Sequence, residues 1–248
     1  MPATAAEIRR LEAIADRAWP AVETRFHDGW ELRATGPGIG RRVNSVAPNS
    51  AGVLSLEQKV ATAEAFYRDR GLPAIFKLTA AARPSSLDAF LAARGYGLDA
   101  PVLILTRPLE PGKASAPLLP ETPSPEWLGA NAAVPSHYGA APAAFLALLA
   151  RIPLRTGFAA AQEAGEVAAI GMAVANGAWV GLFEVGTLPQ RRRRGLATSV
   201  VESLLRWGAG QGARAAYLQV MEANTPARAL YARLGFAEAY RYWYRVAP

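Results

Sequence analysis

The sequence contains no cysteine and only two histidines, His27 and His137, among its 248 residues. The absence of cysteine excludes disulfides, thiolate metal sites, iron–sulfur clusters and a cysteine nucleophile. Two histidines argue against a histidine-rich metal centre, so we expect no metal. Charged residues make up 19% of the chain and hydrophobic residues 51%, a balance typical of a globular protein rather than a disordered one.

Long apolar runs are also missing. No run approaches the roughly 18 residues that a membrane helix needs. Residues 1–20 carry charges where a signal peptide has its apolar stretch. We therefore expect a soluble, cytoplasmic protein with no membrane partner, whose length allows one large domain or two small ones.

The charge that is present is concentrated in one place. The formal net charge is +7, and the second half supplies most of it, with 12 Lys and Arg against 7 Asp and Glu in residues 125–248. Four of those 12 are consecutive: Arg191, Arg192, Arg193 and Arg194. A positive net charge is typical of proteins that bind nucleic acid, an acidic membrane surface or a phosphate-bearing ligand, and here it forms one dense spot rather than a coat.

A proline-rich stretch divides the chain. Proline lacks an amide hydrogen and restricts its own backbone angle, so residues 108–125 resist both helix and sheet. We predict a first domain at residues 1–110, a linker at 111–125 and a second domain at 126–248.

Hydrophobic periodicity predicts a mixed α/β fold in which helices follow strands. In the first half, Thr4 and Glu7 have capping-box spacing ahead of an amphipathic helix. Two strands are expected to follow, joined by a hairpin turn that contains Gly36, Gly38 and Gly40. The predicted elements are helices at residues 4–18, 55–70 and 86–94 and strands at 30–35, 41–47, 74–79 and 102–106.

The second half repeats this pattern after a helical region at residues 126–151. We expect strands at residues 157–163, 167–175, 179–188, 215–221 and 240–246, and helices at 195–208 and 225–234. A shift of 140 residues superposes Gly95-Tyr96 on Gly235-Phe236 and also superposes the helices that follow Ser55 and Gly195. This similarity predicts that one structural unit occurs twice.

The stretch from Val180 to Leu205 carries the chemistry: a strand, a basic loop, and then small residues that open an amphipathic helix. The first amides of a helix have no partners within it and point outward at its positive end. Together with arginine side chains, such a turn is suited to a phosphate or pyrophosphate.

Here the sequence resembles the GNAT acetyltransferase superfamily. That superfamily's pyrophosphate signature is Gln or Arg, two residues, Gly, one residue, then Gly or Ala, and this chain has Arg192, Gly195 and Ala197. Its later signature, an Asn followed by Ala-Leu-Tyr and Gly-Phe, matches residues 224–236. A departure is Arg193, where the family often has its first Gly. The resemblance implies the acyl-CoA N-acyltransferase fold, with its mixed sheet, in the second half. Together with the internal repeat, it implies a tandem GNAT protein.

The resemblance also implies acetyl-CoA as the donor, a primary amine as the acceptor, and roles for particular residues. Tyr231 matches the tyrosine that protonates the leaving thiolate in many relatives, and its hydroxyl is a suitable donor. The strand before the basic loop offers backbone amides, here from Val185 and Leu188, and Asn224 contacts the pantetheine arm. The residues expected to hold the pyrophosphate are Arg191, Arg192, Arg193, Arg194, Gly195, Leu196, Ala197 and Thr198.

The general base is less constrained by the resemblance. Glu184 lies in an apolar strand, where alternation puts it on the face of Val180 and Leu182, so desolvation would raise its pKa. A paired structural carboxylate or an exposed one is the alternative. Glu222 is the second choice, and His137-Tyr138 lies where relatives build the acceptor pocket.

The first half lacks the matching residues. Under the 140-residue shift, Ala197 falls on Glu57, which would repel phosphates, and Tyr231 falls on Leu91, which has no hydroxyl. We therefore expect a degenerate copy that does not bind CoA and instead shapes the acceptor side. Arg41, Arg42 and Asn44 could face that cleft or form an exposed strand face.

The predicted function is N-acetyl transfer from acetyl-CoA to a small-molecule or peptide amine, directly in a ternary complex, because no cysteine exists to carry the acyl group. Two alternatives remain open. One is a nucleic-acid-binding module that uses residues 191–194, which the lack of a basic stripe with interleaved aromatics disfavours. The other is a catalytically silent CoA-binding sensor. The acceptor itself cannot be deduced from the fold.

Overall fold

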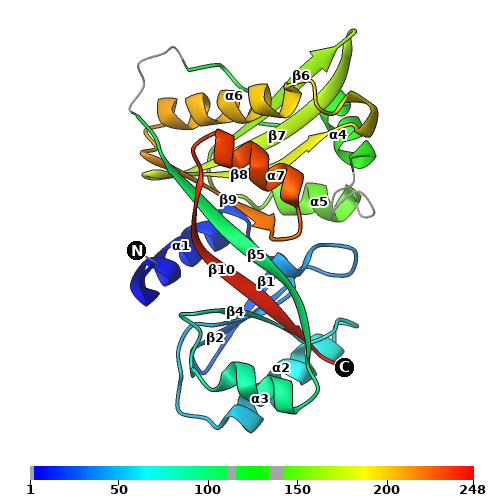
Figure 1. Cartoon of the computed structure of the whole chain (residues 1–248). Helices are drawn as coiled ribbons and strands as arrows, with labels where there is room; N and C mark the ends of the chain where they lie inside the picture. Colours follow the sequence, from blue (N-terminus) through cyan, green and yellow to red (C-terminus); the bar gives the residue numbers. More distant parts are fainter. Residues whose placement is uncertain (1–2, 111–115, 135–141) are drawn as a thin grey trace.

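The computed structural model describes residues 3–110, 116–134 and 142–248 (Figure 1). In this part of the chain, ten strands form one mixed sheet in the order β1-β2-β3-β4-β10-β5-β9-β8-β7-β6. The first half comprises α1 (Ala5–Ala18), β1 (Glu23–His27), β2 (Trp30–Ala34), the 3-10 helix η1 (Arg41–Val43), β3 (Val46–Pro48), α2 (Leu56–Arg68), β4 (Ile75–Thr79), α3 (Leu87–Ala93) and β5 (Gly97–Pro108). The second comprises α4 (Pro125–Ala133), α5 (Pro142–Leu149), β6 (Thr156–Glu163), β7 (Glu166–Asn176), β8 (Trp179–Thr187), the 3-10 helix η2 (Pro189–Arg191), α6 (Leu196–Gly210), β9 (Ala215–Met221), α7 (Thr225–Arg233) and β10 (Ala237–Val246).

The two halves have the same order of elements and the same pairing pattern. In each half, three antiparallel strands are followed by a helix, a strand parallel to the third, a second helix and a final strand. A shift of 140 residues moves α2 onto 196–208, inside α6, and β4 onto 215–219, inside β9. The same shift moves the first residue of β5 onto that of β10. The internal repeat therefore extends from the sequence to the topology.

The final strands of the two halves are exchanged. β10 pairs antiparallel with β4 of the first half, and β5 pairs antiparallel with β9 of the second half. The two exchanged strands also pair with each other, and Figure 1 shows them running together between the two parts of the molecule. Each half thus contributes its final strand to the sheet of the other half.

Helix α1 reinforces this connection. Its capping box between Thr4 and Glu7 and its buried face are those that the sequence predicts. The helix packs against β7 and β8 of the second half. Its Glu12 pairs with Lys77 on β4 and accepts a hydrogen bond of 2.7 Å from the hydroxyl of Tyr240 on β10. One helix therefore ties together strands from both halves.

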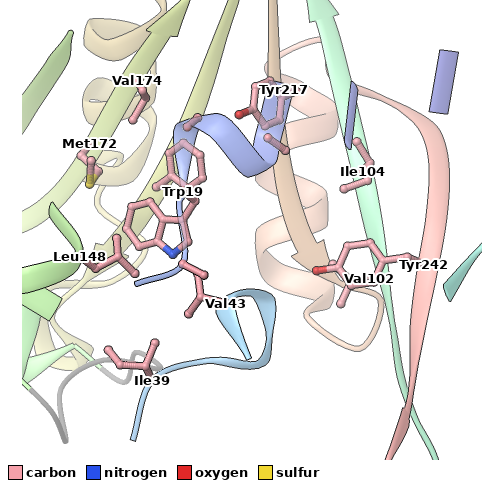
Figure 2. Close-up of a cluster of buried hydrophobic side chains, with 14 of the residues drawn as sticks. Trp19, Ile39, Val43, Val102, Ile104, Leu148, Met172, Val174, Tyr217 and Tyr242 are labelled. Carbon is pink, nitrogen blue, oxygen red and sulfur yellow. The ribbon is translucent and has the colours of Figure 1, made fainter. Parts of the chain in front are cut away.

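The central core contains side chains from both halves. Figure 2 shows Trp19 of the first half among Met172, Val174 and Leu148 of the second, with Val43 on its other side. All five side chains are fully buried or nearly so. Two further clusters lie under α2 and α3 in one half and under α6 and α7 in the other.

Most predicted elements are confirmed, but residues 41–47 are not one strand. They form the 3-10 turn η1 and then the short strand β3. Strand β1 was not predicted, because its residues are almost all exposed and show no alternation. The helical region at 126–151 contains α4 and α5, and β5 is much longer than the predicted 102–106, since its outer part pairs with β10.

Within the described residues, no helix combines the length and apolarity required to cross a membrane. The same residues contain no cluster of three or more His, Cys, Asp or Glu side chains arranged to bind a metal ion.

The exchanged strands predict that the halves hold together without a covalent link. If a protease site is inserted after Glu110 and the chain is cut there, both pieces should stay in one particle with one thermal unfolding transition, because the β5–β9 and β10–β4 ladders cross the cut. Size-exclusion chromatography and calorimetry measure this. Pieces that separate under native conditions would contradict the exchange.

Candidate active site

A cavity of about 560 Å³ opens where two parallel strands separate. β8 and β9 pair from Trp179 and Ala215 only as far as Leu182 and Leu218. Both strands then continue without pairing to each other, β8 to Thr187 and β9 to Met221. Backbone groups at the separated edges are left for a ligand to bind.

A β-bulge in β8 lies at this opening. Ile170 on β7 pairs with Gly186, but Met172 pairs with Phe183, so Glu184 and its neighbour both oppose Gly171. Glu184 has a φ of 50°, the left-handed region that is uncommon for a residue with a side chain. Bulges redirect a side chain, and this one brings Glu184 to the cavity.

The surroundings of Glu184 leave it partly desolvated. Its carboxylate accepts a hydrogen bond of 3.1 Å from the amide nitrogen of Asn131 on α4. Burial raises the pKa of Glu184, while the Asn131 bond and the charge of Arg42 act in the opposite direction. A raised pKa makes the carboxylate a stronger base than an exposed glutamate.

Tyr231 lines the same cavity from α7. Its side chain is 7% exposed, and burial raises the pKa of its hydroxyl to about 12. It is therefore protonated at neutral pH and can act as an acid. Asn224 also lines the cavity and caps α7, since its side-chain oxygen accepts a hydrogen bond of 3.2 Å from the amide of Ala227.

The basic loop leads into α6 through two residues of positive φ, Arg193 at 60° and Gly195 at 80°. The φ of Arg193 lies in the left-handed region, which glycine adopts with little cost. This agrees with the glycine that the GNAT superfamily, which the sequence resembles, often has at this position. Gly195 is the N-cap of α6 and offers no side chain to its first turn. The amides of Leu196, Ala197 and Thr198 are therefore available to an anion.

The arginines of the loop differ in their contacts. Arg191 and Arg194 both pair with Glu163 at the end of β6, at 3.0 Å and 3.1 Å. Arg192 donates a weak bond of 3.4 Å to the Thr187 carbonyl. Arg191 also lies 3.8 Å from Glu166, so two carboxylates of the protein pair with the basic loop.

The two strand residues expected to contact a ligand by their backbones differ as well. Val185 lies in the bulge and lines the cavity. Leu188 instead donates its amide to the Ala168 carbonyl at 2.9 Å, which occupies that donor.

One wall of the cavity comes from the first half. Residues 38–42 and Asp99 line it, and Arg42 lies over the Phe183 ring at 5.6 Å from its centre. Arg41 pairs with Asp99 at 2.5 Å. Asn44 does not join them: it is buried and bonds to the backbone of Thr35, Gly36 and Ile39, which shapes the glycine loop.

The second-choice base does not line the cavity. Glu222 pairs with Arg241 at 3.1 Å on the surface. The predicted acceptor residues His137 and Tyr138 lie outside the described residues. Sequence reasoning missed Asn131, whose only signal is an amide side chain on the otherwise apolar buried face of a helix.

In the first half, the loop that corresponds to the basic loop binds an acidic side chain of the protein itself. The carboxylate of Asp28 accepts hydrogen bonds from the amides of Val53 at 2.9 Å and Leu54 at 3.0 Å, and it pairs with the buried ammonium of Lys59 at 3.2 Å. The bonds from Val53 and Leu54 are the main reason that the pKa of Asp28 is lowered to about 2. Under the 140-residue shift, residues 53–54 correspond to 193–194.

This chain is similar to several known proteins along nearly its whole length. It is 28% identical to "Uncharacterized N-acetyltransferase YobR" of Bacillus subtilis over 97% of this chain and 98% of that one. A GCN5-related N-acetyltransferase from Kribbella flavida shares the fold, with a TM-score of 0.67 at 17% identity over 100% of this chain and 96% of that one. A tandem GNAT protein from the clavulanic acid biosynthesis pathway has a TM-score of 0.61 at 15% identity, over 100% and 91% of the two chains.

The family model described as "Probable histone acetyltransferase Rv0428c C-terminal" matches residues 5–245, which includes both halves and the exchanged strands. The fold and the signatures agree with that match. The chain therefore belongs to this family of GNAT acetyltransferases and is an acyltransferase with the mixed α/β fold of the acyl-CoA N-acyltransferases.

Proposed function

We propose that this protein transfers an acetyl group from acetyl-CoA to a primary amine, directly within a ternary complex. The observation that carries the proposal is one cavity, between separated strands, that is lined by a carboxyl of raised pKa and a protonated tyrosine. Because the chain has no cysteine, no thiol is present to hold the acetyl group between two steps.

The cofactor would lie along the second half. Its pantetheine arm would enter between β8 and β9, where Val185 and Asn224 line the opening. Its pyrophosphate would meet the first turn of α6, with Gly195 allowing close approach and the arginines adding charge. The open space around Gly195, where an added Cβ would meet no atom within 4 Å, supports this position.

The first half would bind no second cofactor. An acidic side chain already accepts the amides of its corresponding loop, and Ser55 caps α2 through the amide of Gln58. A phosphate would have to displace both. The first half instead contributes the wall near Arg42 to the acceptor side.

The reaction removes two protons from the ammonium nitrogen and supplies one to the leaving thiolate. Glu184 would accept a proton from the ammonium, and the amine lone pair would then form a bond to the thioester carbonyl carbon. As the carbon–sulfur bond breaks, Tyr231 would give its hydroxyl proton to the leaving thiolate, and the second proton of the amine nitrogen would restore the Tyr231 hydroxyl. The products are an N-acetyl amide and CoA with a free thiol.

Replacing Gly195 by alanine should weaken acetyl-CoA binding about tenfold, because a Cβ strains a left-handed φ and obstructs the phosphate. Gly177→Ala is the matched control, since Gly177 also has positive φ and open surroundings but lies in the β7–β8 turn. Calorimetry should give one site per chain and an unchanged Kd for the control. Equal weakening in both variants would reject the assignment of the α6 start.

Tyr231→Phe should slow transfer by about 10²–10⁴-fold, the range expected for a lost general acid. Acetyl-CoA should still bind, because the ring that packs against Phe236 remains. Thiol release with a panel of amines measures turnover, and calorimetry measures binding. Unchanged turnover would remove Tyr231 from the mechanism.

Glu184→Gln should lower kcat/KM by at least about 100-fold at neutral pH, because glutamine accepts no proton. Since the active form of a base is deprotonated, the wild-type rate should rise with pH through the raised pKa of Glu184. Glu222→Gln is the control at the surface pair with Arg241, and its rate should stay near wild type. A large loss of rate in Glu222→Gln with little loss in Glu184→Gln would instead make Glu222 the base.

A further inference from the structure

We propose that Asn131 is a positioning residue that holds the Glu184 carboxylate in the orientation in which it accepts the substrate proton. This inference rests on the proposed role of Glu184. It concerns a residue of α4, 53 positions away in sequence, that no signature of the chain indicates.

The contact is specific. The Asn131 side chain is 4% exposed, and its Nδ2 donates to Oε2 of Glu184 at 3.1 Å. Its neighbours on the buried face of α4, Trp127 and Ala130, are apolar. A buried amide in an apolar helix face requires a hydrogen-bonding partner, and here the partner is the candidate base.

The helix that carries Asn131 is anchored on both sides of the bulge. Trp127 donates its indole N–H to the Gly171 carbonyl at 3.4 Å and to the Ala159 carbonyl at 3.1 Å, and Gly171 is the residue opposite Glu184. Val134 packs so closely on Gly186 that an added Cβ there would lie 2.5 Å from it. Asn131 lies between these two contacts along the helix, so its amide has little freedom to move.

The geometry leaves one carboxylate oxygen for chemistry. Asn131 engages Oε2, which leaves Oε1 as the acceptor for a substrate proton. The left-handed backbone of Glu184 sets the direction in which its side chain leaves the strand, and the Asn131 amide fixes the position of the carboxylate. A base must lie within hydrogen-bonding reach of its proton, so orientation is part of its activity.

The Asn131 hydrogen bond stabilises the charged form of the Glu184 carboxylate and so opposes the effect of burial on its pKa. The Arg42 guanidinium from η1 acts in the same direction. The other charged or titratable side chains that line the cavity are Arg41, Asp99, Tyr231, Tyr242 and Tyr244. Unlike these, an amide does not titrate. Its contribution is therefore constant over the working pH range.

The test compares the ionisation of Glu184 in the full chain with and without the amide. In Asn131→Leu, which keeps the volume but removes the donor, the carboxyl should titrate about one pH unit higher, a tenfold change in its ionisation equilibrium. Carbon-13 NMR of glutamate-labelled protein measures this, with the Glu184 signal assigned by its loss in Glu184→Gln. Asn131→Asp, which keeps the shape but adds a like charge, should raise the titration further.

A structural role for α4 predicts a different pattern. Ser124→Ala removes the N-cap of the same helix but leaves the Asn131 donor in place, so the Glu184 titration should stay at the wild-type position. A Glu184 titration that is the same in Asn131→Leu, Asn131→Asp and wild type would overturn the proposal. So would an equal shift in Ser124→Ala.

A kinetic measurement separates this inference from the proposed function. With acetyl-CoA and an accepted amine, the acid limb of the kcat/KM profile should move in the alkaline direction by the same amount in Asn131→Leu, with the KM for acetyl-CoA unchanged. A shifted NMR titration with an unmoved rate limb would reject Glu184 as the base and the catalytic part of this inference. An unmoved NMR titration rejects Asn131 alone.

Discussion

The site depends on the point at which β8 and β9 stop pairing. Up to Leu182 and Leu218 they form an ordinary parallel ladder, and beyond it their facing edges carry unpaired backbone groups. Such edges are costly unless they are solvated or bound, so the separation needs support from elsewhere. The outer edge of β8 is held by β7, and that of β9 is held by β5, a strand from the first half. The exchange of final strands is therefore what keeps the opening in shape.

The bulge at Glu184 lies beside that opening and also needs support from its surroundings. A residue with a side chain at positive φ costs on the order of 1–3 kcal/mol, and partial burial of a carboxylate adds to the cost. Several contacts offset it: the Asn131 bond, the charge of Arg42, and close packing of α4 and α6 around Gly171 and Gly186. These groups come from both halves of the chain. Contacts from both halves thus support the strained position.

The sequence predicts the parts of this arrangement that are local. Periodicity and capping residues locate α1 and the start of α6, and contiguous signatures identify Gly195 and Tyr231. The bulge was not predicted, because alternation continues through Glu184 without a visible break. Asn131 was missed because its partner is distant in sequence. For Arg41 and Arg42 the sequence left two possibilities open, the cleft and an exposed strand face, and the structure places both in the cavity wall. Strand exchange was also inaccessible: since the two copies are similar, one pattern of strands satisfies either pairing of the final edges.

The two halves differ most clearly in whether the protein itself supplies an anion to the loop that precedes the helix. In the first half, the loop amides bind the carboxylate of Asp28, and the Lys59 ammonium balances its charge, so the loop is satisfied by the protein alone. In the second half, Glu163 engages two of the arginines from the side, but Gly195 leaves the first turn of α6 without any side-chain cap. Because a helix start retains free amides and a positive dipole end, the uncapped copy is the one that gains from an external phosphate. The proposed difference in cofactor binding between the two halves thus follows from a single structural difference, whether the fold supplies its own anion.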